Sequence, residues 1–267
     1  MHIIKTLSFI MRYFILATIV ILPGFSEELE NIDATIERIV QKYDLPSMVG
    51  AVIVDGTLHA TGVAGVRKAG SDIEAELNDC YHLGSCTKSM TCCLAAMLIE
   101  EGKLRWDSTV LEIFPEFAET MNPVYKAITV QQLMMQHSGL PRDVFPDGME
   151  ISEFYDFPGD TIQEERHYYT GLILQTEEVY QPGEKYLYSN AGYITLGAMI
   201  EKITGTSWES FIQERIFTPL EMTSAGIGTY GSEAQVDAPW WHVFDEDGQR
   251  IAYAPTKEND LPPVYAP

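Results

Sequence analysis

The sequence is poor in basic residues, with 17 lysines and arginines against 39 aspartates and glutamates in 267 residues. The resulting net charge of −22 repels nucleic acids and anionic membrane surfaces, so neither is expected as a partner. Low-complexity tracts and internal repeats are also lacking, which excludes fibrous and solenoid architectures. The remaining composition, 46% hydrophobic, is that of a globular chain long enough for one large domain or two closely packed lobes.

Long hydrophobic runs are lacking outside the N-terminus. There, basic residues flank the apolar run Phe14–Leu22, and small residues precede an acidic stretch, which is the pattern of a signal peptide with cleavage near Ser26. The run is too short for a comfortable transmembrane helix, although its retention as an anchor is the alternative. We therefore expect a signal peptide at 1–26, a mature domain at 27–267 without a stable membrane span, and a periplasmic or secreted location.

Cysteine is scarce and confined to one stretch, at Cys80, Cys86, Cys92 and Cys93. An even number of cysteines in an exported chain suggests disulfides, but three of these residues share one predicted helix, where the geometry of a disulfide is hard to reach. We favour small buried thiols and leave the disulfide alternative open. No histidine lies near them at the spacing of a zinc site, so neither a metal nor a cofactor is expected.

The pattern of apolar residues and of turn residues predicts the order of elements. Two hairpins are expected, one turning at Asp55-Gly56 and the other at Asp247-Gly248. Thr206 and Glu209 are expected to form a capping box at the start of a helix that ends before Pro219. The other predicted helices cover 29–43, 85–101, 129–137, 161–177 and 189–205. This order predicts an α/β (α+β) fold, an antiparallel sheet flanked by helices with an inserted helical lobe.

Ser-x-x-Lys occurs once, at Ser85 and Lys88. Residues three apart on a helix share one face, about 5–6 Å apart at Cβ. A serine at a helix start gains from the free N–H groups there, and a lysine held among apolar residues can exchange a proton with it. The alternative is that Ser85 caps the helix and Lys88 reaches solvent. The local pattern leaves both interpretations open.

A second pair, Tyr188-x-Asn190, follows the turn at Pro182-Gly183 and precedes a helix. A phenol near a lysine ammonium can act as a general base. The Asn190 amide can donate to a substrate carbonyl and accept from Lys88. The alternative is that Asn190 caps the helix and Tyr188 packs in the core.

Together these segments resemble the serine β-lactamase and penicillin-binding-protein family, in its class C β-lactamase, D-alanyl-D-alanine carboxypeptidase and esterase branch. The resemblance covers about residues 30–267 and rests on four segments in order: Ser85–Lys88, Gln131–Pro141, Pro182–Gly205 and Ile216–Gly228. It implies an acylated nucleophile at Ser85 with Lys88 as its proton partner. It also implies Tyr188 as base, Asn190 as a lysine and substrate contact, and a structural role for His137.

The resemblance implies an exported serine hydrolase that acts on a small-molecule or peptidoglycan-derived acyl substrate, such as a β-lactam, a D-alanyl peptide or an ester. A third family motif, Lys-Thr-Gly or His-x-Gly, does not occur after Asn190, and we interpret the sequence as C-terminally truncated, with the closing strands of the sheet missing. The alternatives are a penicillin-recognising or scaffolding protein without turnover, or an inactive fragment. The substrate and the oligomeric state stay open.

Overall fold

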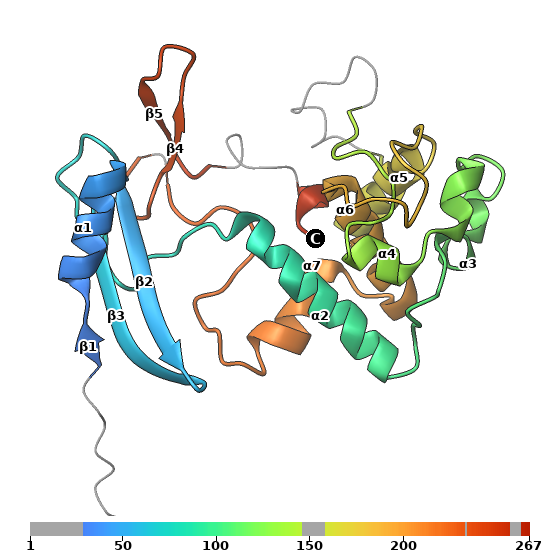
Figure 1. The fold of residues 1–267 in the computed structure, drawn as a ribbon, viewed down its shortest axis with the longest axis horizontal. Helices are drawn as coiled ribbons and strands as arrows, with labels where there is room; N and C mark the ends of the chain where they lie inside the picture. Colours follow the sequence, from blue (N-terminus) through green and yellow to red (C-terminus); the bar gives the residue numbers. More distant parts are fainter. Residues whose placement is uncertain (1–28, 146–157, 233, 257–262) are drawn as a thin grey trace, which may run out of the picture.

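The computed structural model describes residues 29–145, 158–232, 234–256 and 263–267. These residues form a sheet lobe, a helical lobe and a projecting hairpin (Figure 1). This is the α/β architecture that the sequence predicts, a small sheet with helices and a separate helical lobe. The predicted signal peptide lies outside the described residues. In the part of the chain that is described, no helix is both long enough and apolar enough to cross a membrane.

The sheet lobe comes from the first part of the described chain. Its elements are β1 (Glu30–Asn31), α1 (Asp33–Tyr43), β2 (Ser47–Val54) and β3 (Thr57–Gly65). The strand order is β1-β3-β2, in which β2 and β3 form the predicted antiparallel hairpin. Asp55 and Gly56 both have positive φ, as a tight hairpin turn requires. The sequence pattern missed β1, which pairs with β3 in parallel over two residues.

Helix α1 covers one face of this sheet (Figure 1). Ile36 and Val40 are its buried residues. Gly50 in β2 leaves room for this contact, because a Cβ atom there would lie 2.7 Å from Ile36 Cδ1. The helix was predicted to begin at residue 29 but begins at Asp33, because the preceding residues pair with β3 instead.

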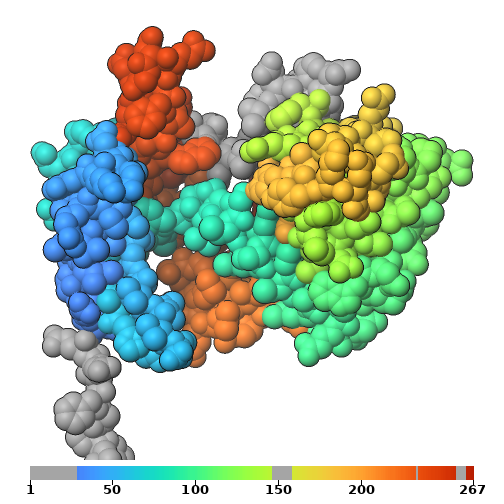
Figure 2. All heavy atoms as spheres, in the orientation of Figure 1, coloured from blue at the N-terminus to red at the C-terminus, as the bar shows by residue number. Residues whose placement is uncertain are grey.

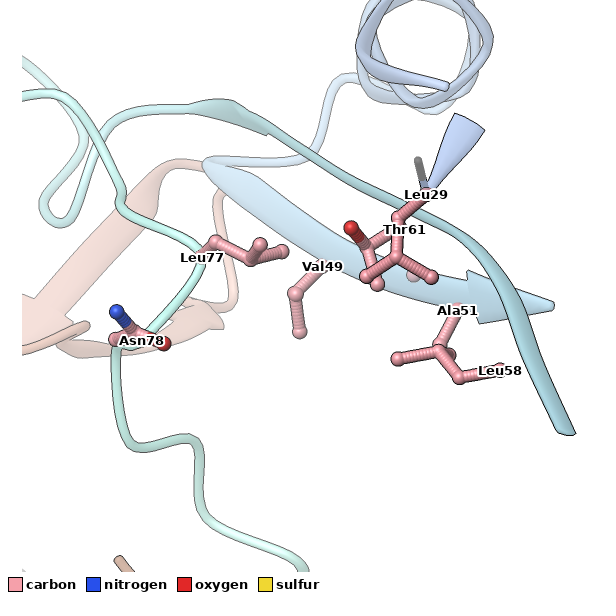
Figure 3. Close-up of a pocket in the computed structure, with 8 residues that line it drawn as sticks. Leu29, Val49, Ala51, Leu58, Thr61, Leu77 and Asn78 are labelled. Atoms are coloured by element: carbon pink, nitrogen blue, oxygen red, sulfur yellow. The ribbon is translucent and has the colours of Figure 1, made fainter. Parts of the chain in front are cut away.

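The sheet also borders an apolar hollow of about 410 Å³ (Figure 3). Its lining residues are Leu29, Val49, Gly50, Ala51, Leu58, Thr61, Leu77 and Asn78. None of the predicted site residues lines this hollow. Ile53, in the edge strand β2, is 67% exposed, so the apolar surface of the lobe extends to the edge of the sheet.

The helical lobe contains the larger part of the buried core. Its helices are α2 (Thr87–Glu100), α3 (Val110–Ile113), α4 (Val130–Met134), α5 (Ile162–Ile173), α6 (Asn190–Thr204) and α7 (Trp208–Ile212). Short helical turns span Gly84–Cys86, Pro115–Phe117, Pro123–Ala127, Gln213–Phe217 and Pro263–Tyr265. α2 lies between the sheet lobe and the other helices (Figure 1). Its position gives the start of α2 access to both lobes.

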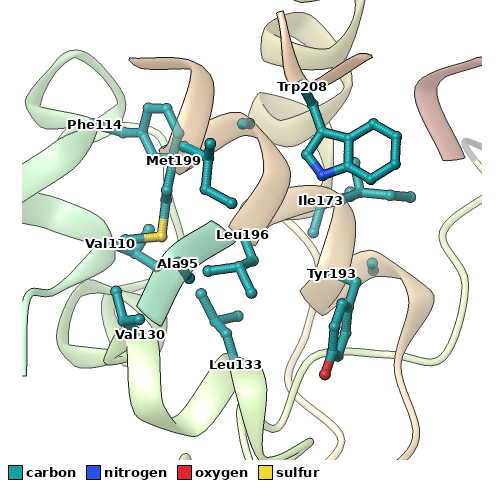
Figure 4. Packing of buried hydrophobic residues seen from close by; sticks show 14 of the residues in the cluster. Ala95, Val110, Phe114, Val130, Leu133, Ile173, Tyr193, Leu196, Met199 and Trp208 are labelled. Atoms are coloured by element: carbon teal, nitrogen blue, oxygen red, sulfur yellow. The ribbon is translucent and has the colours of Figure 1, made fainter. Parts of the chain in front are cut away.

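Helix α6 is the centre of the helical lobe. All its residues from Ala191 to Glu201 are buried, and α2, α4, α5 and α7 pack around it. Figure 4 shows Leu196 and Met199 among the aromatic and aliphatic side chains of this core. A helix that is apolar on all sides is stable only when it is enclosed in this way. The start of α6, which carries Asn190, is therefore set on a rigid base.

The predicted capping box at the start of α7 is wrong. Ser207, not Thr206, caps this helix, because its Oγ accepts from the backbone N–H of Ser210. Glu209 does not reach back to the cap but pairs with the buried Arg166. Pairing a buried guanidinium outweighs a cap bond at the surface, since an unpaired buried charge is far more costly.

All four cysteines are free thiols. Cys80 and Cys92 are half-buried, whereas Cys86 and Cys93 are exposed, so the expectation of buried thiols is wrong for the latter pair. Cys86 lies in the turn before α2, and Cys93 is exposed because the buried face of α2 carries Thr91, Leu94, Ala95 and Leu98 instead. Within the described residues, no group of three or more histidine, cysteine, aspartate or glutamate side chains could hold a metal ion.

The second predicted hairpin is confirmed, with strands β4 (Trp241–Phe244) and β5 (Arg250–Tyr253). Figure 2 shows that it projects from the rest of the molecule. Arg250 ties it to the end of α1 through an ion pair with Asp44 at 2.9 Å. The backbone N–H of Trp240 donates to the carbonyl oxygen of Arg67 at 2.7 Å. The hairpin thus belongs to the sheet lobe although it follows the helical lobe in sequence.

A buried charged cluster joins α5, α6 and α7. The Arg166 guanidinium is fully buried and pairs with Glu201 and, at 2.5 Å, with Glu209. It also donates to the carbonyl oxygens of Pro263, at 3.1 Å, and Val264, at 3.3 Å. Burial raises the pKa of Glu201 to about 7, and the neighbouring Glu209 carboxylate adds to this effect. Burial and the second carboxylate thus outweigh the attraction of the guanidinium, and Glu201 is partly protonated near pH 7.

This cluster predicts that the free energy of unfolding falls as the pH rises from about 5 to about 7. Glu201 ionises at lower pH in the unfolded chain than in the folded one, so the folded state binds more protons in this range. The contribution is roughly 1–3 kcal/mol. Urea unfolding at several pH values measures it. Glu201→Gln should flatten this part of the curve, and an unchanged slope in that variant would contradict the assignment.

Candidate active site

Ser85 lies where the chain turns into α2. It belongs to the short 3-10 turn Gly84–Cys86, directly before the helix begins at Thr87. Gly84 has a φ of +51°, in the left-handed region that glycine adopts most easily. Ser85 is exposed to solvent. A hydroxyl at the start of a 14-residue helix lies near free N–H groups and the positive end of the dipole, which stabilise a developing negative charge.

Tyr188 provides the contact that joins the two predicted motifs. Its hydroxyl donates to Ser85 Oγ at 2.6 Å, although 103 residues separate the two in sequence. Because each hydroxyl can donate or accept, a proton can pass in either direction between the two oxygens. The alternative interpretations of both residues are not observed. Ser85 makes no side-chain hydrogen bond that caps α2, and the Tyr188 hydroxyl faces Ser85 and not the core.

Lys88 is half-buried in the first turn of α2, on the same side as Ser85 and Tyr188. Its Nζ lies 5.3 Å from the ring centroid of Tyr188 and 5.4 Å from that of Tyr193. An ammonium group at these distances is attracted to the faces of both rings. The lysine is therefore held beside the Ser85–Tyr188 pair and does not extend into solvent.

Tyr193, on α6, is a residue near the site that the sequence analysis did not single out. Its hydroxyl donates to the carbonyl oxygen of Met134 at 2.9 Å and lies 3.0 Å from Cys92 Sγ. Burial raises the pKa of Tyr193 well above its usual range and also raises the pKa of the Cys92 thiol. Both groups therefore stay neutral at pH 7. The Tyr193 ring thus forms a neutral wall beside Lys88.

Gln136 fixes the backbone on both sides of Tyr188. Its carbonyl oxygen accepts from the N–H of Leu187 at 2.8 Å, and its Oε1 accepts from the N–H of Ser189 at 2.8 Å. Gln136 is buried. Two hydrogen bonds from one buried residue hold the neighbours of Tyr188 in place, so the ring direction is set by the scaffold.

The turn at His137-Ser138-Gly139 also holds the segment before Tyr188 in place. The carbonyl oxygen of His137 accepts from Gly183 at 2.7 Å, and its ring lies 6.1 Å from that of Tyr186. Gly139 has a φ of +76°, and a Cβ atom there would lie 2.0 Å from the carbonyl oxygen of Tyr180. Only glycine allows the two segments to approach so closely. These contacts agree with the structural role expected for His137.

Asn190 has a different partner from the one expected. Its Nδ2 donates to Asp143 Oδ1 at 2.7 Å, and no hydrogen bond to Lys88 is found within the described residues. Ser189, not Asn190, caps α6 by accepting from the N–H of Gly192 at 2.8 Å. Because an ionised carboxylate only accepts hydrogen bonds, the amide nitrogen must face Asp143, which leaves the Asn190 carbonyl oxygen for another donor.

A family model described as Beta-lactamase matches residues 32–257. The chain belongs to the beta-lactamase family. This match includes Ser85, Lys88, Tyr188 and Asn190, and it agrees with the resemblance drawn from the four sequence segments.

Three proteins similar to this chain show how far the likeness extends. Protein flp of Staphylococcus aureus is 26% identical over 246 residues, which cover 87% of this chain and 47% of that protein. The D-alanine carboxypeptidase AmpC from Burkholderia cenocepacia superposes with a TM-score of 0.62 at 19% identity, covering 86% of this chain and 56% of that one. A class C beta-lactamase mutant superposes with a TM-score of 0.65 at 19% identity, covering 88% and 58%. At these identities the two structures support the beta-lactamase fold and nothing finer.

This beta-lactamase-family chain spans about half the length of the curated relatives it matches.

Arg142 and Asp143 are the residues near Tyr188 and Asn190 that sequence reasoning did not single out. The available signal was their position directly after the Gln131–Pro141 segment. That signal gives proximity to the site and says nothing about which side chains the two residues contact.

Proposed function

We propose that the protein is an exported serine hydrolase that forms an acyl-enzyme at Ser85. The observation that carries this proposal is the 2.6 Å hydrogen bond from the Tyr188 hydroxyl to Ser85 Oγ, with the Lys88 ammonium beside the same ring. Nucleophile and base within hydrogen-bond reach of each other are the arrangement that covalent catalysis requires. Membership of the beta-lactamase family supports the same chemistry.

In this mechanism Ser85 Oγ attacks the carbonyl carbon of an acyl substrate. The serine proton passes to Tyr188 while the proton of the Tyr188 hydroxyl moves on, directly or through Lys88, to the leaving group as its bond to the carbonyl breaks. The start of α2 stabilises the negative charge near the nucleophile. Water then attacks the acyl-enzyme and releases the acid, while the proton returns to Ser85. Asn190 Oδ1 is free to accept from a substrate N–H or from Lys88, because Asp143 engages its nitrogen.

The proposed substrate is a small-molecule or peptidoglycan-derived acyl compound. The names of the similar proteins include a penicillin-binding protein, a D-alanine carboxypeptidase and a class C beta-lactamase, which supports β-lactams, D-alanyl peptides and esters as candidates. The signal-peptide pattern before residue 27 supports a periplasmic or secreted location, where such compounds occur.

The test is to label the protein covalently and find the labelled residue. A fluorophosphonate and a fluorescent penicillin are each incubated with the protein, and the modified peptide is identified by tandem mass spectrometry. We expect at least the fluorophosphonate to add one label, at Ser85. Label at Ser89 or Ser138, or none with either reagent, would reject the proposal.

A further inference from the structure

Arg142 is fixed by its backbone at the entrance to the site. Its carbonyl oxygen accepts from the N–H of Asn190 at 2.7 Å and from that of Ala191 at 3.2 Å, at the start of α6. These bonds place Arg142 beside the segment that carries Tyr188. Its side chain, in contrast, is 70% exposed. The residue therefore combines a fixed base with a guanidinium that can meet a ligand from solvent.

The guanidinium lies over the ring of the tyrosine that contacts the nucleophile. Its Cζ is 5.4 Å from the ring centroid of Tyr188, whose hydroxyl donates to Ser85. A long, flexible side chain at this distance from Tyr188 can reach part of a substrate that is bound at Ser85. Lys88 lies over the same ring, so two cations gather here in a chain with a net charge of −22. With Asp143 beside Arg142, the described charges nearest this ring are two positive and one negative.

The ion pair of Arg142 is longer than the shortest ion pair of any other described arginine that forms one. Its Nε lies 3.4 Å from Asp143 Oδ2, and Asn190 already holds the other oxygen of that carboxylate. By comparison, Arg67 pairs with Asp79 at 2.6 Å. Strong charge-assisted hydrogen bonds are about 2.7–2.9 Å long. With a single long contact and five donors in a planar fork, Arg142 keeps donors available for a ligand.

We propose that Arg142 is a specificity-determining residue that binds a carboxylate on the substrate. The proposal rests on the proposed acyl-enzyme function and adds the charge of the substrate to it. A guanidinium fork matches both oxygens of a carboxylate, and attraction is strongest where other cations already offset the negative charge of the protein. The carboxylate can lie on the acyl part of the substrate or on its leaving group, and the experiment distinguishes the two.

The experiment compares kcat/KM for esters that differ in one carboxylate. Mono-p-nitrophenyl glutarate against p-nitrophenyl butyrate tests the acyl side. The acetate of 3-carboxy-4-nitrophenol against p-nitrophenyl acetate tests the leaving-group side. We expect the wild type to favour the anionic member of one pair. Arg142→Gln should lower kcat/KM for that ester about tenfold to hundredfold, the value of a hydrogen-bonded charge, and leave the neutral partner unchanged.

Two further variants separate a specific contact from general electrostatics. Arg38, exposed on α1 in the sheet lobe, gives a matched control, because Arg38→Gln makes the same change of charge away from the site. It should keep the preference of the wild type. Arg142→Lys keeps the charge without the fork and should give an intermediate preference. Added salt should weaken the preference of the wild type more than that of Arg142→Gln.

The proposal is overturned if the wild type shows no preference for a carboxylate in either pair. It is also overturned if Arg142→Gln slows the neutral and anionic esters equally, because Arg142 would then only position Tyr188. If no ester turns over, the rates at which the same esters block fluorophosphonate labelling of Ser85 are compared, and equal rates for each pair overturn it. Failure to label Ser85 at all is a separate result that rejects the acyl-enzyme function.

Discussion

The Lys88→Met variant is expected to acylate Ser85 about 10²–10⁴-fold more slowly than the wild type while keeping its thermal stability. Methionine retains the unbranched stem that packs beside Tyr188 and Tyr193, but it has no amine to carry a proton. A positioned proton-transfer group contributes a factor of this size. The measurement is the rate of fluorophosphonate labelling, with a thermal melt of the same sample.

Two variants complete this experiment. Ser85→Ala sets the background, since it lacks the nucleophile. Lys42→Met is the matched control, because Lys42 on the surface of α1 also lies over a tyrosine ring, 4.9 Å from the centroid of Tyr43. Lys42 belongs to the sheet lobe and is far from Ser85 in sequence. Lys42→Met should label at the rate of the wild type. Equal labelling of Lys88→Met and the wild type would show that Lys88 has no part in acylation.

The sequence could predict only those contacts of the site that join residues close together in the chain. Ser85 and Lys88 are three residues apart at a helix start, and this spacing alone brings them to one side. The contact between Ser85 and Tyr188 spans 103 residues, and it could be expected only from the family resemblance. The pairing of Asn190 with Asp143 was not predictable, because it depends on how the loop after residue 141 meets the start of α6.

The same distinction holds for the fold: elements with a local sequence pattern were predicted, and those set by contacts between distant residues were not. Both hairpins were predicted, because Asp-Gly favours tight turns: Asp55 and Gly56 both have positive φ in the first hairpin, and Gly248 has it in the second. The parallel strand β1 was missed, because two residues carry no periodic pattern. The cap of α7 was misplaced by one residue because Thr206 and Ser207 are both good caps, and the choice follows from the pairing of Glu209 with Arg166 across the core.

That pairing leads to the largest expected effect on stability. Arg166→Met should lower the free energy of unfolding by about 3–5 kcal/mol at pH 8, where it leaves buried carboxylate unpaired. The arginine is fully buried, contacts Glu201 and Glu209, and also holds the carbonyl oxygens of Pro263 and Val264. Its loss therefore removes the charge partner and two backbone contacts together. Urea unfolding of the variant and the wild type measures the difference.

The pH dependence and a second substitution show whether unpaired charge is the cause. The loss should be smaller at pH 5, because Glu201, with its pKa raised to about 7, is then protonated. Adding Glu201→Gln to Arg166→Met should recover part of the loss at pH 8 for the same reason. Lys202→Met is the matched control, since it breaks an exposed pair between α6 and Glu116 and should cost less than about 1 kcal/mol. A loss for Arg166→Met that is equally small, or that is the same at both pH values, would mean that this cluster does not hold the three helices together through its charges.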